Sequence, residues 1–185
     1  MAIAGRLLSA DHHAEMEQRT YLLLLTNVFL IAMDNDIQNR LAQLGLQLPA
    51  PINPLGSYRT TVTLGDQLFV SSLGPFKDGK PVVGIVGDDF SIADAQEAAQ
   101  RTMLLILACV EEACGLENVE RCARLTVYVR AESGFTAHPK VADGASDLLL
   151  ALFGPDRLPA RSAIGVFTLP MGIPVEIDSV FQLKR

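Results

Sequence analysis

Arg161 and Glu176 are the two residues whose types and spacing could serve one chemical purpose. Arg161 opens a mostly apolar run, Ser162–Thr168, and Glu176 lies inside a second run, Pro174–Leu183. An arginine beside apolar walls is a natural receptor for a small carboxylate, because its planar fork makes two parallel charge-assisted hydrogen bonds. The alternative is a structural ion pair between Arg161 and Glu176, and the pattern alone favours that ion pair.

The two runs flank a turn-forming segment, Leu169-Pro-Met-Gly172, whose proline and glycine are common in turns. The second run alternates, so that Val175 and Ile177 point to one face and Glu176 to the other. A hairpin-like arrangement of the two runs would bring Arg161 and Glu176 near one cleft.

The elements that must position these residues follow from periodicity and punctuation. The longest helix is expected where Ser91 and Asp94 form a variant of the capping box, and Gly115 ends it. The predicted strands are Arg59–Leu64, Gln67–Ser71, Cys122–Val129, Ser162–Thr168 and Pro174–Leu183, and the predicted helices are Asp34–Leu44, Ile92–Cys114 and Lys140–Phe153. This order predicts an α/β (α+β) fold, a mixed sheet with two helices packed on one face.

Composition places the chain among soluble globular proteins with one well-buried domain. Its 185 residues are 49% hydrophobic and 19% charged, which leaves room for subunit contacts as well as a core. The net charge of −6, the pI near 5.0 and the absence of a Lys/Arg cluster argue against a nucleic-acid surface.

The cysteines and histidines do not suggest a metal site or a disulfide framework. Cys109, Cys114 and Cys122 are odd in number and lack CxxC or Cys/His spacing, so free thiols in a reducing cytoplasm are expected. His12-His13 and His138 are isolated. We therefore expect no metal and no cofactor.

The N-terminal stretch differs from the rest and is expected to form an extension over residues 1–47, ahead of a domain over 48–185. Its apolar run, Tyr21–Met33, is too short to span a bilayer. The flank with Glu15 and Glu17 does not resemble the basic flank of a signal peptide. A docking segment, or translated sequence upstream of a start at Met33, is favoured over a secretory signal, and a cytoplasmic protein without membrane contact is expected.

Several short motifs recur in the right order from Leu48 to the C-terminus. They are Gly56-Ser-Tyr58, Leu68-Phe-Val-Ser71, Glu112-Ala-Cys-Gly115, Leu125-Thr-Val-Tyr-Val129, Pro159-Ala-Arg-Ser162, Leu169-Pro170 and Val175-Glu-Ile177. On these motifs the sequence resembles the Rid family, the reactive-intermediate deaminases of YjgF type, also called endoribonuclease L-PSP, in a longer and divergent branch.

The resemblance implies a chorismate-mutase-like fold and a homotrimer with a closed central sheet barrel and sites at subunit interfaces. It also implies hydrolysis of enamine and imine intermediates, such as 2-aminoacrylate and 2-iminopropionate, to 2-keto acids and ammonia. Arg161 would then grip the substrate carboxylate, and Glu176 would hold or polarise the attacking water. Tyr58 and Ser71 would shape the pocket.

Two residues depart from the family pattern. Ser72 replaces the usual glycine after the pocket serine, which narrows the site, and Ala163 stands where many members carry cysteine. Two other functions stay open beside the deaminase. One is a non-catalytic trimeric protein that binds small carboxylate metabolites, and the other is a ribonuclease, which the acidic pI disfavours.

Overall fold

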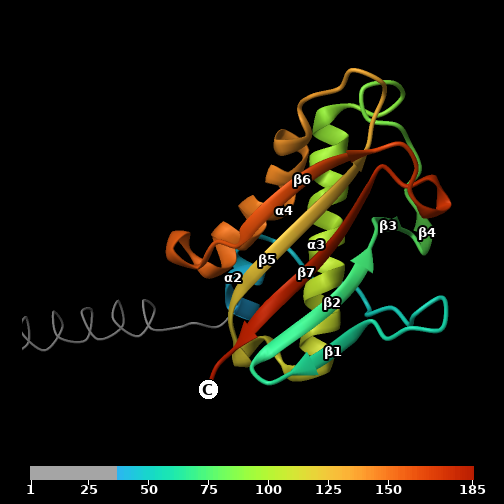
Figure 1. The fold of residues 1–185 in the computed structure, drawn as a ribbon. Coiled ribbons are helices and arrows are strands. Elements are labelled where there is room, and N and C mark those ends of the chain that lie inside the picture. Colours follow the sequence, from blue (N-terminus) through green and yellow to red (C-terminus); the bar gives the residue numbers. More distant parts are fainter. Residues whose placement is uncertain (1–36) are drawn as a thin grey trace, which may run out of the picture. The chain divides into compact units, whose positions relative to one another are not determined.

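Five strands form one mixed sheet in the order β1-β2-β7-β5-β6, which can be followed in Figure 1. The computed structural model describes residues 37–185. The strands are β1 Thr61–Leu64, β2 Gln67–Leu73, β5 Val119–Arg130, β6 Ala160–Val166 and β7 Val175–Leu183. β5 and β6 run parallel, and the other neighbouring pairs of this sheet are antiparallel. The predicted mixed sheet is confirmed.

Two long helices, α3 (Ile92–Cys114) and α4 (His138–Phe153), pack on one face of the sheet, as predicted. The Ser91 hydroxyl accepts a hydrogen bond from the Asp94 backbone N–H (3.1 Å), and the Asp94 carboxylate accepts one from the Ser91 N–H (3.3 Å). This capping box fixes the start of α3 where the sequence places it. Gly115, with a φ of 77°, follows its last residue.

The face under the helices, here called the covered face, is the main core. Leu125, Val127, Ile177 and Phe181 have no exposed surface there. The helices also approach each other closely, since a Cβ at Gly144 of α4 would overlap the backbone of Gln96 in α3. A residue without a side chain is therefore needed at this crossing.

The opposite face of the sheet, here called the open face, has no described helix over it (Figure 1). Large apolar side chains of its strands are exposed there, among them Val62 (50%), Leu64 (72%), Phe69 (40%) and Ile164 (42%). An apolar surface of this kind commonly marks an interaction site.

The predicted hairpin of the last two strands is wrong. β6 and β7 do not pair with each other, because β5 lies between them, parallel to β6 and antiparallel to β7. A parallel pair needs a crossover connection, and α4 supplies it between β5 and β6. The segment with the 3₁₀ turn Pro170–Gly172 therefore carries the chain across β5 rather than back along β6.

A short helix, α2 (Ile37–Gln43), belongs to the same compact unit as the sheet. Ile37 and Leu41 are buried in the main core, and Nη1 of Arg40 donates to the carbonyl of Leu152 in α4 (2.6 Å). This compact unit comprises Ile37–Arg185. The expectations for His12-His13, for Tyr21–Met33 and for a start at Met33 lie outside the described residues. Within residues 37–185, no helix has both the length and the apolar character needed to cross a bilayer.

The segment from Gly74 to Asp89 contains one small hairpin. Its strands are β3 (Phe76–Lys77) and β4 (Lys80–Pro81). Asp78 and Gly79 between them both have positive φ, 52° and 74°. An Asp-Gly pair suits this turn, which needs two left-handed residues.

Candidate functional site

Arg161 lies on β6, the strand at one edge of the sheet, and its side chain reaches α4. Its register partner is Leu125, a residue of the covered face. Nη1 of Arg161 donates to Oδ1 of Asp143 (2.8 Å) and to Oγ of Ser146 (2.9 Å). The side chain of Arg161 is 25% exposed and that of Asp143 is 44% exposed. Arg161 is thus anchored to a helix while part of it still faces solvent.

Asp143 and Ser146 are site residues that the sequence analysis missed. They stand three residues apart on α4 and so share one side of that helix. The available signal was a pair of polar residues at this spacing, around Gly144-Ala145, in a helix that is otherwise largely apolar. The spacing does not tell which strand that side of the helix will meet.

Glu176 lies on the open face, opposite Tyr128 in the register of β7 and β5. The hydroxyl of Tyr128 donates to Oδ2 of Asp178 (3.0 Å), and this hydrogen bond is the main cause that raises the pKa of Tyr128. Burial, with a further contribution from the charge of Asp178, raises the pKa of Glu176. Glu176, Asp178 and Tyr128 therefore form a polar cluster on this face.

Arg161 and Glu176 lie on opposite faces of the sheet within one protomer. Both the shared cleft expected from a hairpin and the alternative ion pair between the two residues are wrong for a single copy. The reason is the strand order, which puts β5 between β6 and β7 and leaves Asp143 as the ionic partner of Arg161.

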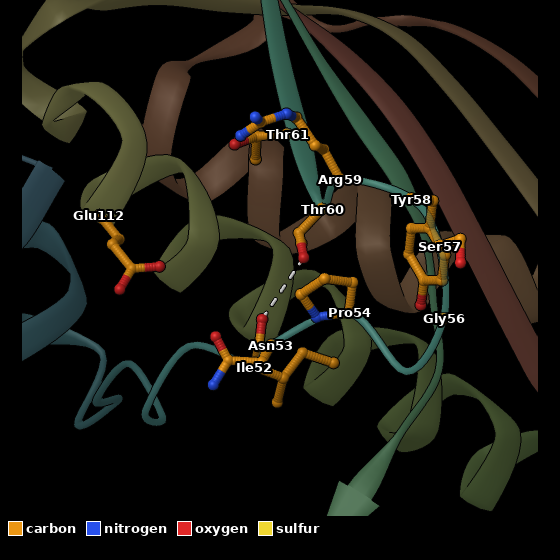
Figure 2. A pocket seen from close by; sticks show the side chains of 10 residues that line it. All are labelled: Ile52, Asn53, Pro54, Gly56, Ser57, Tyr58, Arg59, Thr60, Thr61 and Glu112. Atoms are coloured by element: carbon orange, nitrogen blue, oxygen red, sulfur yellow. Dashed lines mark hydrogen bonds between the residues drawn. The ribbon is translucent and has the colours of Figure 1, made fainter.

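Tyr58 lines a pocket of about 610 Å³ at the opposite edge of the sheet, beside β1. Figure 2 shows Tyr58 on one side of this pocket and Glu112, from α3, on the other. Tyr58 is 48% exposed, and its hydroxyl oxygen accepts a hydrogen bond from the backbone N–H of Leu55 (3.3 Å). Thr60 forms part of the wall, where its hydroxyl donates to the carbonyl of Ile52 (3.5 Å).

Ser71 lies next to this pocket, on β2, where the register against β7 shifts between Val70 and Leu73. Its backbone N–H donates to the carbonyl of Thr60 (2.9 Å). Its hydroxyl oxygen is buried and has no hydrogen-bond partner in the described part of the chain. The side chains of Arg121 and Ser179 also have a buried polar atom without a partner among the described residues. Buried polar groups are nearly always paired, and water or a ligand can satisfy such an atom.

A second cavity, of about 580 Å³, lies where β5 and β6 end, and His138 and Arg130 are among its lining residues. The ring of His138 meets that of Phe135 edge to face, with centroids 5.1 Å apart. It also sits directly over Gly165, where a Cβ would overlap it. The sequence predicts no role for His138, and the structure places it in the wall of this cavity, packed against Phe135 and Gly165.

The three cysteines are free and poorly suited to nucleophilic chemistry. Burial raises the pKa of Cys122 to about 12 and also raises the pKa values of Cys109 and Cys114. A thiol with a raised pKa holds little thiolate at neutral pH.

Comparison with known proteins identifies relatives of this chain. A family model described as "YjgF/chorismate_mutase-like, putative endoribonuclease" matches residues 38–177. The chain is 38% identical over 148 residues to "Protein TCP17" of Trypanosoma cruzi, covering 78% of this chain and 92% of that protein. The match to the family model includes all the motifs from Gly56 to Ile177 on which the resemblance rests.

Two solved structures are similar along most of the chain. One is Atu1372 of Agrobacterium tumefaciens, a protein of unknown function, with 33% identity, a TM-score of 0.75 and coverage of 85% of this chain and 99% of that one. The other, from Shewanella oneidensis, is described as a "putative endoribonuclease" and has 30% identity, a TM-score of 0.76 and coverage of 80% and 99%.

RidA from a Psychrobacter species is more distant, with 21% identity, a TM-score of 0.51 and coverage of 74% and 95%. Similarity at that level shows the fold alone.

Proposed function

The chain belongs to the YjgF/chorismate mutase-like family, as its motifs predicted, and we propose that it hydrolyses reactive enamine and imine intermediates that carry a carboxylate. Examples are 2-aminoacrylate and 2-iminopropionate, which give a 2-keto acid and ammonia. The observation that carries this proposal is the guanidinium of Arg161, which is tied to α4 through Nη1 and has Nε and Nη2 unpaired among the described residues. A free edge of this kind matches the two oxygens of a carboxylate.

The chemistry requires a positioned water and a proton acceptor. The enamine takes a proton at its terminal carbon and becomes the imine. Water then adds to the carbon of the protonated imine while Glu176 accepts a proton from the water, which gives a carbinolamine. Glu176 returns this proton to the carbinolamine nitrogen, and the C–N bond breaks as the hydroxyl loses its proton to solvent, which leaves the 2-keto acid and ammonia. Holding the substrate beside the water supplies much of the required acceleration. The raised pKa of Glu176 makes its carboxylate a stronger proton acceptor than an ordinary glutamate.

The proposed residues come from three places in one protomer, so the site is completed by further copies of the chain. Arg161 lies at the β6 edge, Tyr58 and Ser71 at the β1–β2 edge, and Glu176 on the open face between them. In the proposed homotrimer, the β6 edge of one copy packs over the open face and the Tyr58 pocket of the next. Contacts between two different surfaces close into a ring when the rotation permits.

Two features of the protomer support this assembly. The open face exposes large apolar residues, including Leu64 at 72% and Phe69 at 40%, which a neighbouring copy would cover. The buried hydroxyl of Ser71 lacks a partner among the described residues, and a ligand or a neighbouring copy would provide one.

The decisive experiment for the reaction is a coupled assay. A pyridoxal-phosphate dehydratase generates 2-aminoacrylate, and the decay of that intermediate is followed with and without this protein. We expect faster decay with the wild-type protein and none of that acceleration with Arg161→Ala. Decay at the spontaneous rate with wild-type protein would reject the deaminase.

Subunit complementation tests the shared site. Arg161→Ala and Glu176→Gln are each expected to be inactive, and sedimentation should report trimers for both. If each site takes Arg161 from one copy and Glu176 from the next, randomly mixed trimers regain roughly one intact site in four. A monomer, or mixed trimers without any recovery, would reject the interface site.

A non-catalytic protein that binds small carboxylates is the second candidate. The separation of Arg161 from Glu176 in one protomer favours it, since Arg161 alone suffices for binding. Binding of a 2-keto acid without acceleration of 2-aminoacrylate decay would establish this function instead.

A ribonuclease fits the description of the family model but not the charge of this chain. The net charge is −6, and no cluster of Lys and Arg is present in the sequence. Such a surface repels a polyanion. Cleavage of a labelled RNA that Arg161→Ala abolishes would overturn this judgement.

A further inference from the structure

The manner in which Arg161 is held suggests a role for two residues outside the proposed reaction, and the inference rests on Arg161 binding a carboxylate as proposed. We propose that Asp143 and Ser146 are positioning residues that fix one end of the Arg161 guanidinium, so that its opposite edge is presented to the ligand.

Both hydrogen bonds from Arg161 to α4 leave from the same nitrogen. Nη1 donates to Oδ1 of Asp143 at 2.8 Å and to Oγ of Ser146 at 2.9 Å, which uses both of its N–H donors. A guanidinium has five N–H donors in one plane. The three that remain, one on Nε and two on Nη2, have no partner among the described residues.

The unpaired nitrogens are accessible. Neither Nε nor Nη2 is among the described side-chain atoms that are buried without a hydrogen-bond partner, and the side chain of Arg161 is 25% exposed. Nε and Nη2 form the edge that binds a carboxylate through two parallel hydrogen bonds. Asp143, the acidic partner of Arg161, therefore binds Nη1 and leaves the edge formed by Nε and Nη2 open.

The two anchors sit on a rigid element. Asp143 and Ser146 are three residues apart on α4, a helix of 16 residues whose other side is buried in the core. Arg161 itself has a long side chain with many rotamers. Fixing one end of its guanidinium in advance removes part of the ordering cost that ligand binding otherwise carries.

A different interpretation gives Asp143 the opposite effect. Its carboxylate could compete with the ligand for Arg161, in which case removing it would strengthen binding. The two interpretations predict changes of opposite sign and can therefore be separated with variants at this position.

The test measures binding of 2-oxobutanoate, a stable keto acid, by isothermal titration and by the NMR shift of the Arg161 Nε–H signal. The informative variant is Asp143→Ala combined with Ser146→Ala, which removes both acceptors. Asp143→Asn removes the charge and keeps one acceptor oxygen. Asp147→Asn is the matched control, because Asp147 is an exposed residue of the same helix with no ion pair to a described residue.

We expect the double variant to bind 2-oxobutanoate about three- to tenfold more weakly than wild type. Asp143→Asn, which keeps one acceptor oxygen, should bind no more tightly than wild type but more tightly than the double variant, and Asp147→Asn should not differ from wild type. In an Arg161→Lys background, removal of the two acceptors should have no further effect. Melting temperatures should remain close to that of wild type, because the ion pair is partly exposed.

Binding by the double variant that equals or exceeds wild-type binding would overturn the inference. Wild-type protein that binds no 2-oxobutanoate would overturn it as well, whatever its turnover. Wild-type protein that follows the expected binding pattern but does not accelerate 2-aminoacrylate decay would reject the proposed deaminase and leave the positioning role intact.

Discussion

The two faces of the sheet differ in what their side chains do, and strand β7 shows the difference within one element. Val175, Ile177 and Phe181 point to the covered face and have no exposed surface. Glu176 and Asp178, which alternate with them, lie on the open face, where burial and the charge of Asp178 raise the pKa of Glu176. The residues on one face of β7 thus belong to the core, and those on the other face belong to the candidate site.

Arg161 does not follow this division. It lies on the same side of the sheet as the helices, but at the β6 edge, where α4 supplies polar partners in place of a hydrophobic cover. A charged side chain can therefore lie on the covered face when its strand is at the edge of the sheet. The following predictions compare the effects on stability and activity of changes on each face, beginning with the largest expected effect.

The first prediction concerns α2 and its contribution to the core. Deleting residues 1–36 should leave a cooperatively folding protein, whereas deleting residues 1–47 removes the buried side chains of Ile37 and Leu41. Loss of one such side chain costs about 2–5 kcal/mol, so the longer deletion should unfold most of the protein. Chemical denaturation of both truncations checks this. Equal stability of the two would show that α2 contributes nothing to the core.

The second prediction compares two phenylalanines on opposite faces. Phe181→Ala should lower the free energy of unfolding by about 3–5 kcal/mol at every protein concentration. Phe69→Ala, at a position that is 40% exposed, should cost an amount that grows with protein concentration, because in the proposed homotrimer its partner is another copy of the chain. Denaturation over a range of concentrations separates the two. A Phe69→Ala effect independent of concentration would argue against contact at the open face.

The third prediction concerns Arg161. Arg161→Lys keeps the charge but loses the two-pronged geometry, and a lost charge-assisted hydrogen bond is worth roughly 1.5–3 kcal/mol. Catalytic efficiency should therefore fall by about one to two powers of ten, and further in Arg161→Ala. Thermal stability should change little, because the pair with Asp143 is partly exposed. Normal turnover in Arg161→Ala would remove the residue from the mechanism.

Much of the fold could be predicted from local patterns. The capping residues Ser91 and Asp94 and the terminal Gly115 determine where α3 begins and ends, and the prediction of Ile92–Cys114 is confirmed. Such signals are short-range and survive in any tertiary context.

Strand pairing could not be predicted in the same way. The two last strands look like a hairpin in the sequence, because alternation identifies a strand but not its neighbour. The insertion of β5 between them depends on packing of α4, and it separates Arg161 from Glu176. For the same reason the anchors Asp143 and Ser146 could not be assigned to Arg161 before the fold was known.

The docking of α2 is a further contact that the sequence alone does not reveal. The three prolines Pro49, Pro51 and Pro54 predict an extended, non-helical stretch, and the segment around them is without a helix or strand. The helix ahead of it packs through contacts with residues far along the chain, such as the hydrogen bond from Arg40 to the carbonyl of Leu152. Local sequence patterns do not predict contacts between residues that are so far apart in the sequence.

The last prediction concerns Glu176 and has the smallest expected effect on stability. Burial, followed by the charge of Asp178, raises the pKa of Glu176 above its ordinary value of 4.5. The folded protein therefore binds this proton more tightly than the unfolded chain does. Ionised Glu176 destabilises the fold at pH values above the raised pKa, while below the ordinary value both states are protonated and the penalty vanishes.

Glu176→Gln should consequently raise the free energy of unfolding at about pH 7.5 and lose that gain as the pH falls toward about 4. The same change removes the proposed proton acceptor, so turnover should drop while binding of 2-oxobutanoate persists. In the wild-type protein, activity should fall on the acid side at a pH above the ordinary glutamate range, because the unprotonated form is the active one. Denaturant titrations of wild type, Glu176→Gln and the control Asp147→Asn at both pH values measure the stability difference. If the gain in the free energy of unfolding from Glu176→Gln were largest at acid pH, the open face would stabilise the carboxylate of Glu176. That result would reject the idea that the folded protein keeps Glu176 buried at a cost in stability for the sake of its chemistry.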